Sequence, residues 1–157
     1  MILNSMKQLL SIIAFIFSFQ LQAQIKLPAL PDSLFPTYYH QRVSFFRVMP
    51  VTKNEIIFLG NSITDGAEWA QLFNDKRMIN QGISGDISAG VLNRLDAVIN
   101  RKPSKVFLLI GTNDLARGIS ADSVLKNILL INDYVKQQPA CSKRAGRPSI
   151  WMACCTR

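Results

Sequence analysis

Three short apolar runs along the chain are separated by longer stretches that mix apolar and polar residues. The runs are residues 55–59 (EIIFL), the segment around Met78 and Ile79 that ends before Gly82, and residues 106–110 (VFLLI). The first run is followed by Gly60 and the third by Gly111. An apolar run of this length that ends at a turn residue is typical of a buried β-strand. The pattern therefore predicts three strands.

The stretches between the runs have the spacing of helices. Apolar residues recur every three or four positions from Asp86 onward and again after Ser120, which is a suitable helix cap. These sets are Ile87, Val91, Leu95 and Val98 in the first helix, and Val124, Ile128, Ile131 and Val135 in the second. Asp65 and Glu68 have the spacing of a capping box and predict a short helix over residues 69–73. Residues 38–48 predict a further helix packed on the domain.

Strands that alternate with helices of this length predict parallel βαβ units and an α/β fold. The loops that leave the three strands contain Ser62, Gly82 and Asn113 respectively. Parallel strands end at one edge of the sheet, and open α/β sheets bind their ligands at that edge. If the first strand lies between the other two, these three residues converge.

A serine hydroxyl beside a glycine N–H and a carboxamide suits acyl transfer. The hydroxyl attacks a carbonyl carbon, and the preorganised donors stabilise the oxyanion that develops. Gly82 is suited to this role because a residue without Cβ lets the backbone approach the reacting atom closely. The side chain of Asn113 is a donor that does not titrate near neutral pH.

The composition fits one domain and limits its partners. The 157 residues have a formal net charge of +8, and 48% are apolar, which excludes a disordered or collagen-like chain. Residues 24–138 contain 13 basic and 10 acidic side chains, whereas residues 139–157 contain four basic side chains, no acidic one and all three cysteines. The basic excess lies mainly in this tail and forms no basic stripe with interleaved aromatic residues, so we expect no nucleic-acid partner.

The sequence predicts neither a metal site nor a cofactor. The three cysteines lack metal-ligand spacing, because Cys154 and Cys155 are adjacent. The glycines at 82, 85 and 90 lack the Lys-Ser/Thr ending of a phosphate-binding loop.

Residues 1–24 have the layout of a secretory signal peptide. Lys7 supplies the positive charge, an apolar run covers residues 9–19, and Ala23 lies at a suitable cleavage position. The apolar run rises about 16 Å as a helix, about half the thickness of a hydrocarbon core, so no stable membrane span is expected after cleavage. We expect a secreted or periplasmic protein; a buried N-terminal helix is the alternative.

The segments FLGNSITDG, INQGISGD and GTND resemble blocks I, II and III of the GDSL/SGNH hydrolase family over about residues 55–138. That resemblance implies a serine esterase or acylhydrolase on a flavodoxin-like three-layer α/β/α sandwich. It also implies that Ser62 is the nucleophile, and that the Ser62 N–H, the Gly82 N–H and the Asn113 side chain form the oxyanion hole. Asn61 replaces the aspartate of the name-giving motif, as in bacterial members that act on acetylated sugars. The expected substrate is therefore an ester, with O-acetyl groups of a carbohydrate or lipid favoured.

The fourth block of that family, Asp-x-x-His, is absent, and with it the general base that the resemblance implies. The one histidine, His40, precedes the first strand and is interpreted as a surface or packing residue, with a role as base the alternative. We therefore expect the fold to be incomplete at its C-terminal end. Residues 1–24, 25–138 and 139–157 are expected to be signal peptide, hydrolase domain and an atypical tail from a truncated or frameshifted reading frame. Within the tail, residues 149–153 (SIWMA) resemble a short strand.

Two functions remain open from the sequence. The first is a secreted serine esterase that forms an acyl-enzyme on Ser62, and the second is an inactive domain or binding module without the general base. Three acidic residues near the loops are given structural interpretations. Asp65 and Asp86 are expected at helix starts, and Asp114 is expected to brace the loop of Asn113.

Overall fold

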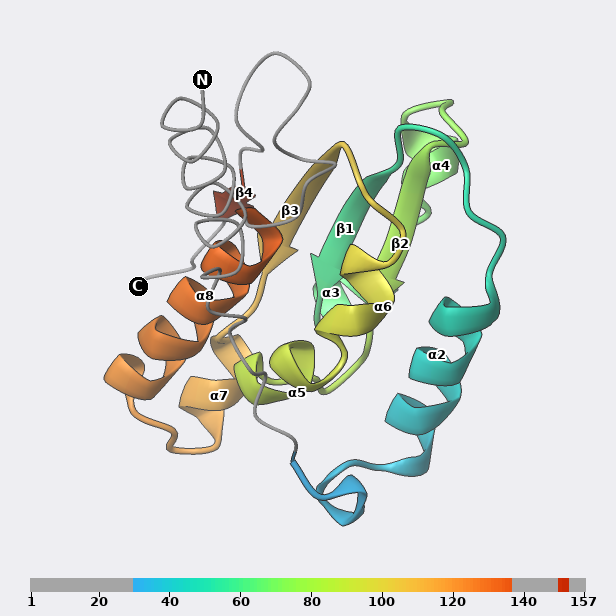
Figure 1. Ribbon diagram of the computed structural model, residues 1–157. Helices are drawn as coiled ribbons and strands as arrows, with labels where there is room; N and C mark the ends of the chain where they lie inside the picture. Colours follow the sequence, from blue (N-terminus) through green and yellow to red (C-terminus); the bar gives the residue numbers. More distant parts are fainter. Residues whose placement is uncertain (1–29, 137–149, 153–157) are drawn as a thin grey trace, which may run out of the picture.

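The computed structural model describes residues 30–136 and 150–152 as a parallel sheet with helices on both faces (Figure 1). The strands are β1 (Ile56–Gly60), β2 (Met78–Gly82), β3 (Lys105–Leu109) and β4 (Ile150–Met152), in the order β2-β1-β3-β4. The first three confirm the predicted strands, and β1 lies between β2 and β3 as the convergence of the loops requires. The predicted signal peptide and most of residues 139–157 lie outside the described residues.

The sheet register aligns the carboxyl ends of the three predicted strands. Gly60 at the end of β1 pairs with Gly82 at the end of β2 and with Leu109 at the end of β3. The short strand expected within residues 149–153 is also present, because Ile150–Met152 pairs in parallel with Val106–Leu108 of β3. The chemistry predicted for the loops after β1, β2 and β3 is therefore confined to one edge of the sheet.

The helices confirm most of the sequence pattern. They are η1 (Asp32–Leu34), α2 (Thr37–Val48), α3 (Ser62–Asp65), α4 (Trp69–Leu72), α5 (Ser88–Asn93), α6 (Leu95–Ile99), α7 (Thr112–Ala116) and α8 (Ala121–Lys136). The Ser120 hydroxyl accepts a hydrogen bond from the Ser123 N–H at 3.3 Å, as expected for the cap of α8. All four apolar residues predicted for the inner face of α8 are buried.

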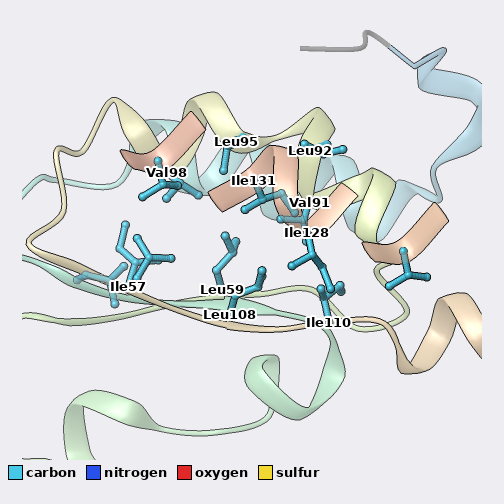
Figure 2. Packing of buried hydrophobic residues seen from close by; sticks show 14 residues of the cluster. Ile57, Leu59, Val91, Leu92, Leu95, Val98, Leu108, Ile110, Ile128 and Ile131 are labelled. Atoms are coloured by element: carbon cyan, nitrogen blue, oxygen red, sulfur yellow. The ribbon is translucent and has the colours of Figure 1, made fainter. Parts of the chain in front are cut away.

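The pleat of β1 divides its side chains between two layers of helices. Ile57 and Leu59 are fully buried and pack with residues of α5, α6 and α8 (Figure 2). Between them, Phe58 stacks on Trp69 of α4 with ring centroids 4.0 Å apart. Because alternate residues of a strand face opposite sides, the sheet is covered on both faces. This is the α/β/α arrangement expected from the sequence.

The single helix predicted from Asp86 onward is wrong. The chain forms two short helices, α5 and α6, which are separated at Arg94 with φ −114° and ψ 16°. The Arg94 side chain is fully buried and reaches back to the Asp86 carboxylate and the Gly60 carbonyl. The apolar spacing survives the break, since Val91, Leu95 and Val98 remain buried on one side.

The α2 helix packs on the domain as predicted. Its buried residues Tyr39, Val43 and Phe46 form a second core cluster with Ile83 and Ala97. A buried ion pair fixes the segment that follows: Arg101 bonds to both carboxylate oxygens of Glu55 at 2.7 Å and donates to the carbonyl groups of residues 49 and 50. Arg101 thereby joins the segment that follows α2 to Glu55, which immediately precedes β1.

Candidate active site

Ser62 is the first residue of α3, and its side chain is exposed. The buried Asn61 before it caps the helix, because its Oδ1 accepts the Ile63 N–H at 3.1 Å. Its Nδ2 donates to the Thr112 hydroxyl at 2.9 Å. Asn61 therefore joins the loop after β1 to the loop after β3. An aspartate at position 61 would lack the amide hydrogen that makes this second bond.

Gly82 ends β2 beneath α3. A Cβ at this position would lie within 2.6 Å of the Thr64 carbonyl carbon and closer still to the backbone of Asp65. Glycine is therefore required here by the close approach of α3 to β2. The Gly82 N–H donates to Asn80 Oδ1 at 2.8 Å.

Asn80 is a residue that the sequence analysis did not single out. Its Nδ2 donates to the carbonyl groups of Thr64, Asp65 and Ala67 at 2.9–3.0 Å. Together with its bond from Gly82, these contacts fix the C-terminal end of α3 on β2. Its position in the INQG segment, two residues before Gly82, could have indicated that Asn80 lies near the site. The sequence does not show which carbonyl groups its side chain reaches.

Gly85 lies in the turn after β2 and is exposed, with φ +80°. Its carbonyl accepts a hydrogen bond from Arg117 Nη2 at 2.8 Å. In the part of the chain that the structure describes, its N–H has no hydrogen-bond partner. Of the two glycines, Gly85 therefore has the free amide, whereas that of Gly82 is occupied.

Asn113 is the second residue of α7 and is partly buried. Its Nδ2 donates to the Asp86 carbonyl at 2.8 Å. One amide hydrogen is used in this bond, which orients the carboxamide and leaves the second hydrogen for another acceptor. The bond also joins the loop after β3 to the loop after β2.

The Asp86 side chain forms a buried ion pair instead of a helix cap. Arg94 Nε donates to Asp86 Oδ2 at 2.9 Å, and the two side chains are 0% and 1% exposed. Burial raises the pKa of Asp86 and the Arg94 charge opposes that rise. Arg94 Nη2 also donates to the Gly60 carbonyl, so the pair connects the turn after β2 to the end of β1.

Asp114 braces the loop of Asn113, as predicted. Its buried carboxylate accepts hydrogen bonds from the Ser88 N–H at 3.0 Å and from the Ser88 hydroxyl. Asn127 of α8 donates to the same hydroxyl at 2.8 Å. The carboxylate therefore holds the start of α5.

The predicted capping role of Asp65 is wrong. Asp65 is the last residue of α3, and α4 is preceded by Glu68 without a side-chain cap. The carboxylate instead bonds to Tyr38 of α2 and to Ser84 in the turn after β2. Long-range partners have replaced the local bond that the spacing suggested.

His40 lies in α2, and its ring makes edge contacts with those of Phe35 and Tyr39 at 6.4 and 5.6 Å. These contacts agree with its interpretation as a packing residue. Among the described residues the Ser62 hydroxyl has no hydrogen-bond partner, neither a histidine nor a carboxylate. Residues 30–136 and 150–152 therefore present a nucleophile without an adjacent base.

A cavity of about 210 Å³ opens beside Gly85. Its walls come from the η1–α2 segment on one side and from the turn after β2 on the other, with Arg117 at its edge. Its apolar lining residues include Leu34, Phe35, Tyr39, Ile83 and Ile87. Mainly apolar side chains thus surround a space that borders the free amide.

Residues 30–136 and 150–152 contain neither a membrane-spanning helix nor a metal-binding cluster. No helix there has the length and apolar character needed to cross a membrane. No cluster of histidine, cysteine or acidic side chains within those ranges is arranged to hold a metal ion.

Comparisons with known proteins agree with this geometry. Residues 58–150 match the model of the GDSL-like Lipase/Acylhydrolase family. Over 55 residues the chain is 42% identical to Esterase TesA of Pseudomonas aeruginosa, an alignment that covers 34% of this chain and 27% of the esterase.

Solved structures show the same fold. A GDSL-like lipase from Bacteroides thetaiotaomicron VPI-5482 matches with a TM-score of 0.54 and 29% identity over 64% of this chain and 53% of the lipase. A protein from Bacteroides fragilis NCTC 9343 described as an acylhydrolase matches with a TM-score of 0.53 and 28% identity, covering 69% and 55% of the two chains. The protein thus spans about half the length of these structures. The family model covers more than half of the chain and includes all three loops, so the chain belongs to the GDSL-like lipase/acylhydrolase family.

Proposed function

We propose that the protein is a serine esterase that cleaves carboxylic esters through an acyl-enzyme on Ser62. The observation that carries this proposal is the joining of three loops at one sheet edge by Asn61–Thr112 and Asn113–Asp86 hydrogen bonds. These bonds hold the exposed Ser62 and the free hydrogen of Asn113 on one rigid framework. Family membership supports the reaction class.

In the proposed reaction, Ser62 Oγ attacks the ester carbonyl carbon and the carbonyl oxygen becomes an oxyanion. The sequence assigned one of its donors to Gly82, but that amide is occupied by Asn80. We assign this role to the free Gly85 N–H, beside the Ser62 N–H and the second Asn113 hydrogen. Three donors aimed at the developing charge stabilise the transition state more than the neutral ester. Collapse of the intermediate releases the alcohol, and water then releases the acid.

The proposed substrate is an O-acetyl ester of a carbohydrate or lipid. An acetyl group adds one methyl group to the reacting carbonyl, so the larger alcohol half is the part that fits the cavity beside Gly85. The signal-peptide pattern of residues 1–24 supports export to the periplasm or beyond the cell.

The test is release of p-nitrophenol from p-nitrophenyl acetate by the purified full chain, with p-nitrophenyl phosphate as the control. The proposal predicts saturable cleavage of the acetate alone. Equal release from both compounds, or no release above buffer, contradicts it.

A second candidate function is an ester-binding module without hydrolytic activity. It is favoured by one observation, the absence of a base beside the Ser62 hydroxyl among the described residues. Saturable binding of an ester without cleavage would distinguish this function from the first.

The cavity yields a prediction on substrate size. Leu34 is 63% exposed at its rim, so Leu34→Trp fills space without disturbing the core. Loss of about 40 Å² of apolar contact corresponds to about a fivefold rise in KM for p-nitrophenyl acetate. The KM for ethyl acetate, which has a small alcohol half, is expected to stay within about twofold.

The matched control is Leu125→Trp on the exposed side of α8, where Leu125 is 55% exposed. It is expected to leave both KM values unchanged. An equal rise for the two esters in Leu34→Trp would contradict the assignment of the cavity to the alcohol half.

A further inference from the structure

We propose that Asp65 is a positioning residue that holds the Ser84–Gly85 turn against the helix that begins with Ser62. This inference rests on the proposed function, because it gives the Gly85 amide a defined place beside the nucleophile. Asp65 occupies the junction of three elements. Its backbone ends α3, while its carboxylate contacts both α2 and the turn after β2.

The carboxylate has an unusually full set of partners. Its Oδ2 accepts hydrogen bonds from the Tyr38 hydroxyl at 2.8 Å, the Ser84 N–H at 3.0 Å and the Ser84 hydroxyl at 2.7 Å. Arg42 Nη2 lies 3.4 Å from Oδ1. The Asp65 side chain is only 11% exposed. An ionised carboxylate offers the acceptor sites for all four groups and strengthens each contact by its charge.

The backbone that carries this carboxylate is itself fixed. Asn80 donates to the Thr64, Asp65 and Ala67 carbonyl groups, and the missing Cβ of Gly82 lets α3 lie directly on β2. The Asp65 side chain is therefore fixed relative to Ser62, because both residues belong to the same short helix. Its two hydrogen bonds to Ser84 fix the turn relative to that helix.

The Gly85 amide immediately follows Ser84, whose N–H and hydroxyl are both held by Asp65. On its other side, Arg117 holds the Gly85 carbonyl and Asn113 holds the Asp86 carbonyl. Without the Asp65 carboxylate the turn loses the two bonds to Ser84 and keeps those made by Arg117 and Asn113. Because hydrogen bonds weaken steeply with distance and angle, a small displacement of the Gly85 N–H would weaken its contact with an oxyanion and leave binding of the neutral ester nearly unchanged.

Tyr38 provides a graded comparison. The hydrogen bond to Asp65 is the largest cause of the raised pKa of Tyr38, and it favours the protonated phenol that donates this bond. Tyr38→Phe removes one of the four partners and retains both bonds to Ser84. Asp65→Ala removes all four, whereas Asp65→Asn retains one oxygen that can accept from Ser84.

The experiment measures kcat and KM for p-nitrophenyl acetate with these three variants of the full chain. Asp65→Ala is expected to lower kcat about thirtyfold with KM within about twofold, since a displaced donor costs less than a deleted one. Asp65→Asn and Tyr38→Phe are expected to stay within about fivefold of the native kcat. Equal losses in Asp65→Ala and Asp65→Asn, or a rise in KM as the main effect, would overturn the positioning role.

A second measurement does not depend on turnover. Methylboronic acid forms a bond between boron and Ser62 Oγ, becomes a tetrahedral anion and releases the hydroxyl proton to solvent. Boron NMR of the native chain, Ser62→Ala and Asp65→Ala gives the affinity. We expect about tenfold weaker binding in Asp65→Ala and none in Ser62→Ala.

The outcomes separate the two ideas. Absence of the Ser62 adduct in the native chain contradicts the proposed function. An adduct with equal affinity in the native chain and Asp65→Ala leaves that function standing and contradicts the role of Asp65. Thermal unfolding of each variant provides the folding control.

Discussion

Replacing Ser62 by alanine is expected to lower kcat/KM for p-nitrophenyl acetate by about a thousandfold or more. The exposed hydroxyl is the atom that forms the acyl-enzyme in the proposed reaction, whereas the hydroxyl of Thr112, the first residue of α7, is bonded to Asn61 Nδ2 at 2.9 Å. Alanine at the first position of α3 leaves the Asn61 cap intact, because Asn61 Oδ1 bonds to the Ile63 N–H. The fold is therefore expected to be unchanged.

The matched control is Ser123→Ala. Ser123 is an exposed serine in the first turn of α8, and within the described part of the chain its hydroxyl bonds to that of Ser120 at 2.9 Å. This variant is expected to retain the native rate. If Ser62→Ala also retained it, Ser62 would not be the nucleophile.

The largest effect on stability is expected from Arg94→Met. The change removes the charge that compensates the Asp86 carboxylate, which is 1% exposed, and leaves the Gly60 carbonyl without its arginine donor. Breaking a buried ion pair in this way lowers the free energy of unfolding by about 3–5 kcal/mol. Urea denaturation of the native and variant chains at pH 7 measures the difference.

This loss is expected to depend on pH. Burial already raises the pKa of Asp86, and removing Arg94 raises it further. A carboxyl group with a higher pKa in the folded state binds protons more tightly there than in the unfolded chain, so its contribution to stability falls as pH rises through the interval between the two values. The destabilisation of Arg94→Met is therefore expected to be smaller at pH 4 than at pH 7.

Two comparisons make this prediction specific. Arg47 pairs with Asp96 on the surface, where the side chains are 51% and 42% exposed, so Arg47→Met is expected to change the free energy of unfolding by less than about 1 kcal/mol. Adding Asp86→Asn to Arg94→Met removes the unpaired charge and is expected to recover part of the loss. An additive loss in the double variant would show that the ion pair is not the cause.

The sequence pattern was informative wherever local spacing decides the structure. The apolar runs predicted β1, β2 and β3, and the spacing of four and then three positions between Val124, Ile128 and Ile131 predicted the buried face of α8. It failed at Arg94, because a buried arginine that bonds to the end of β1 interrupts a helix whose apolar spacing is continuous. The buried Glu55–Arg101 pair was equally invisible, since its partners are 46 positions apart.

The same distinction applies to the candidate site. The segments containing Ser62 and Asn113 could be placed at one sheet edge from topology alone. The part played by Gly82 could not, because it depends on how closely α3 lies on β2. Asp65 had the spacing of a cap, yet its carboxylate bonds to Tyr38 and Ser84, 27 and 19 positions away. Contacts of that separation are set by the tertiary fold and leave no local pattern.

Labelling of Ser62 with a fluorophosphonate tests the central claim most directly. The reagent forms a bond between phosphorus and the attacking oxygen, fluoride leaves, and the hydroxyl proton passes to solvent. Mass spectrometry of the full chain after proteolysis locates the label. We predict one label per chain on the peptide that contains Ser62, and none in Ser62→Ala. Absence of the label, or its presence on another residue in both chains, would contradict the assignment of Ser62 as the nucleophile of this protein.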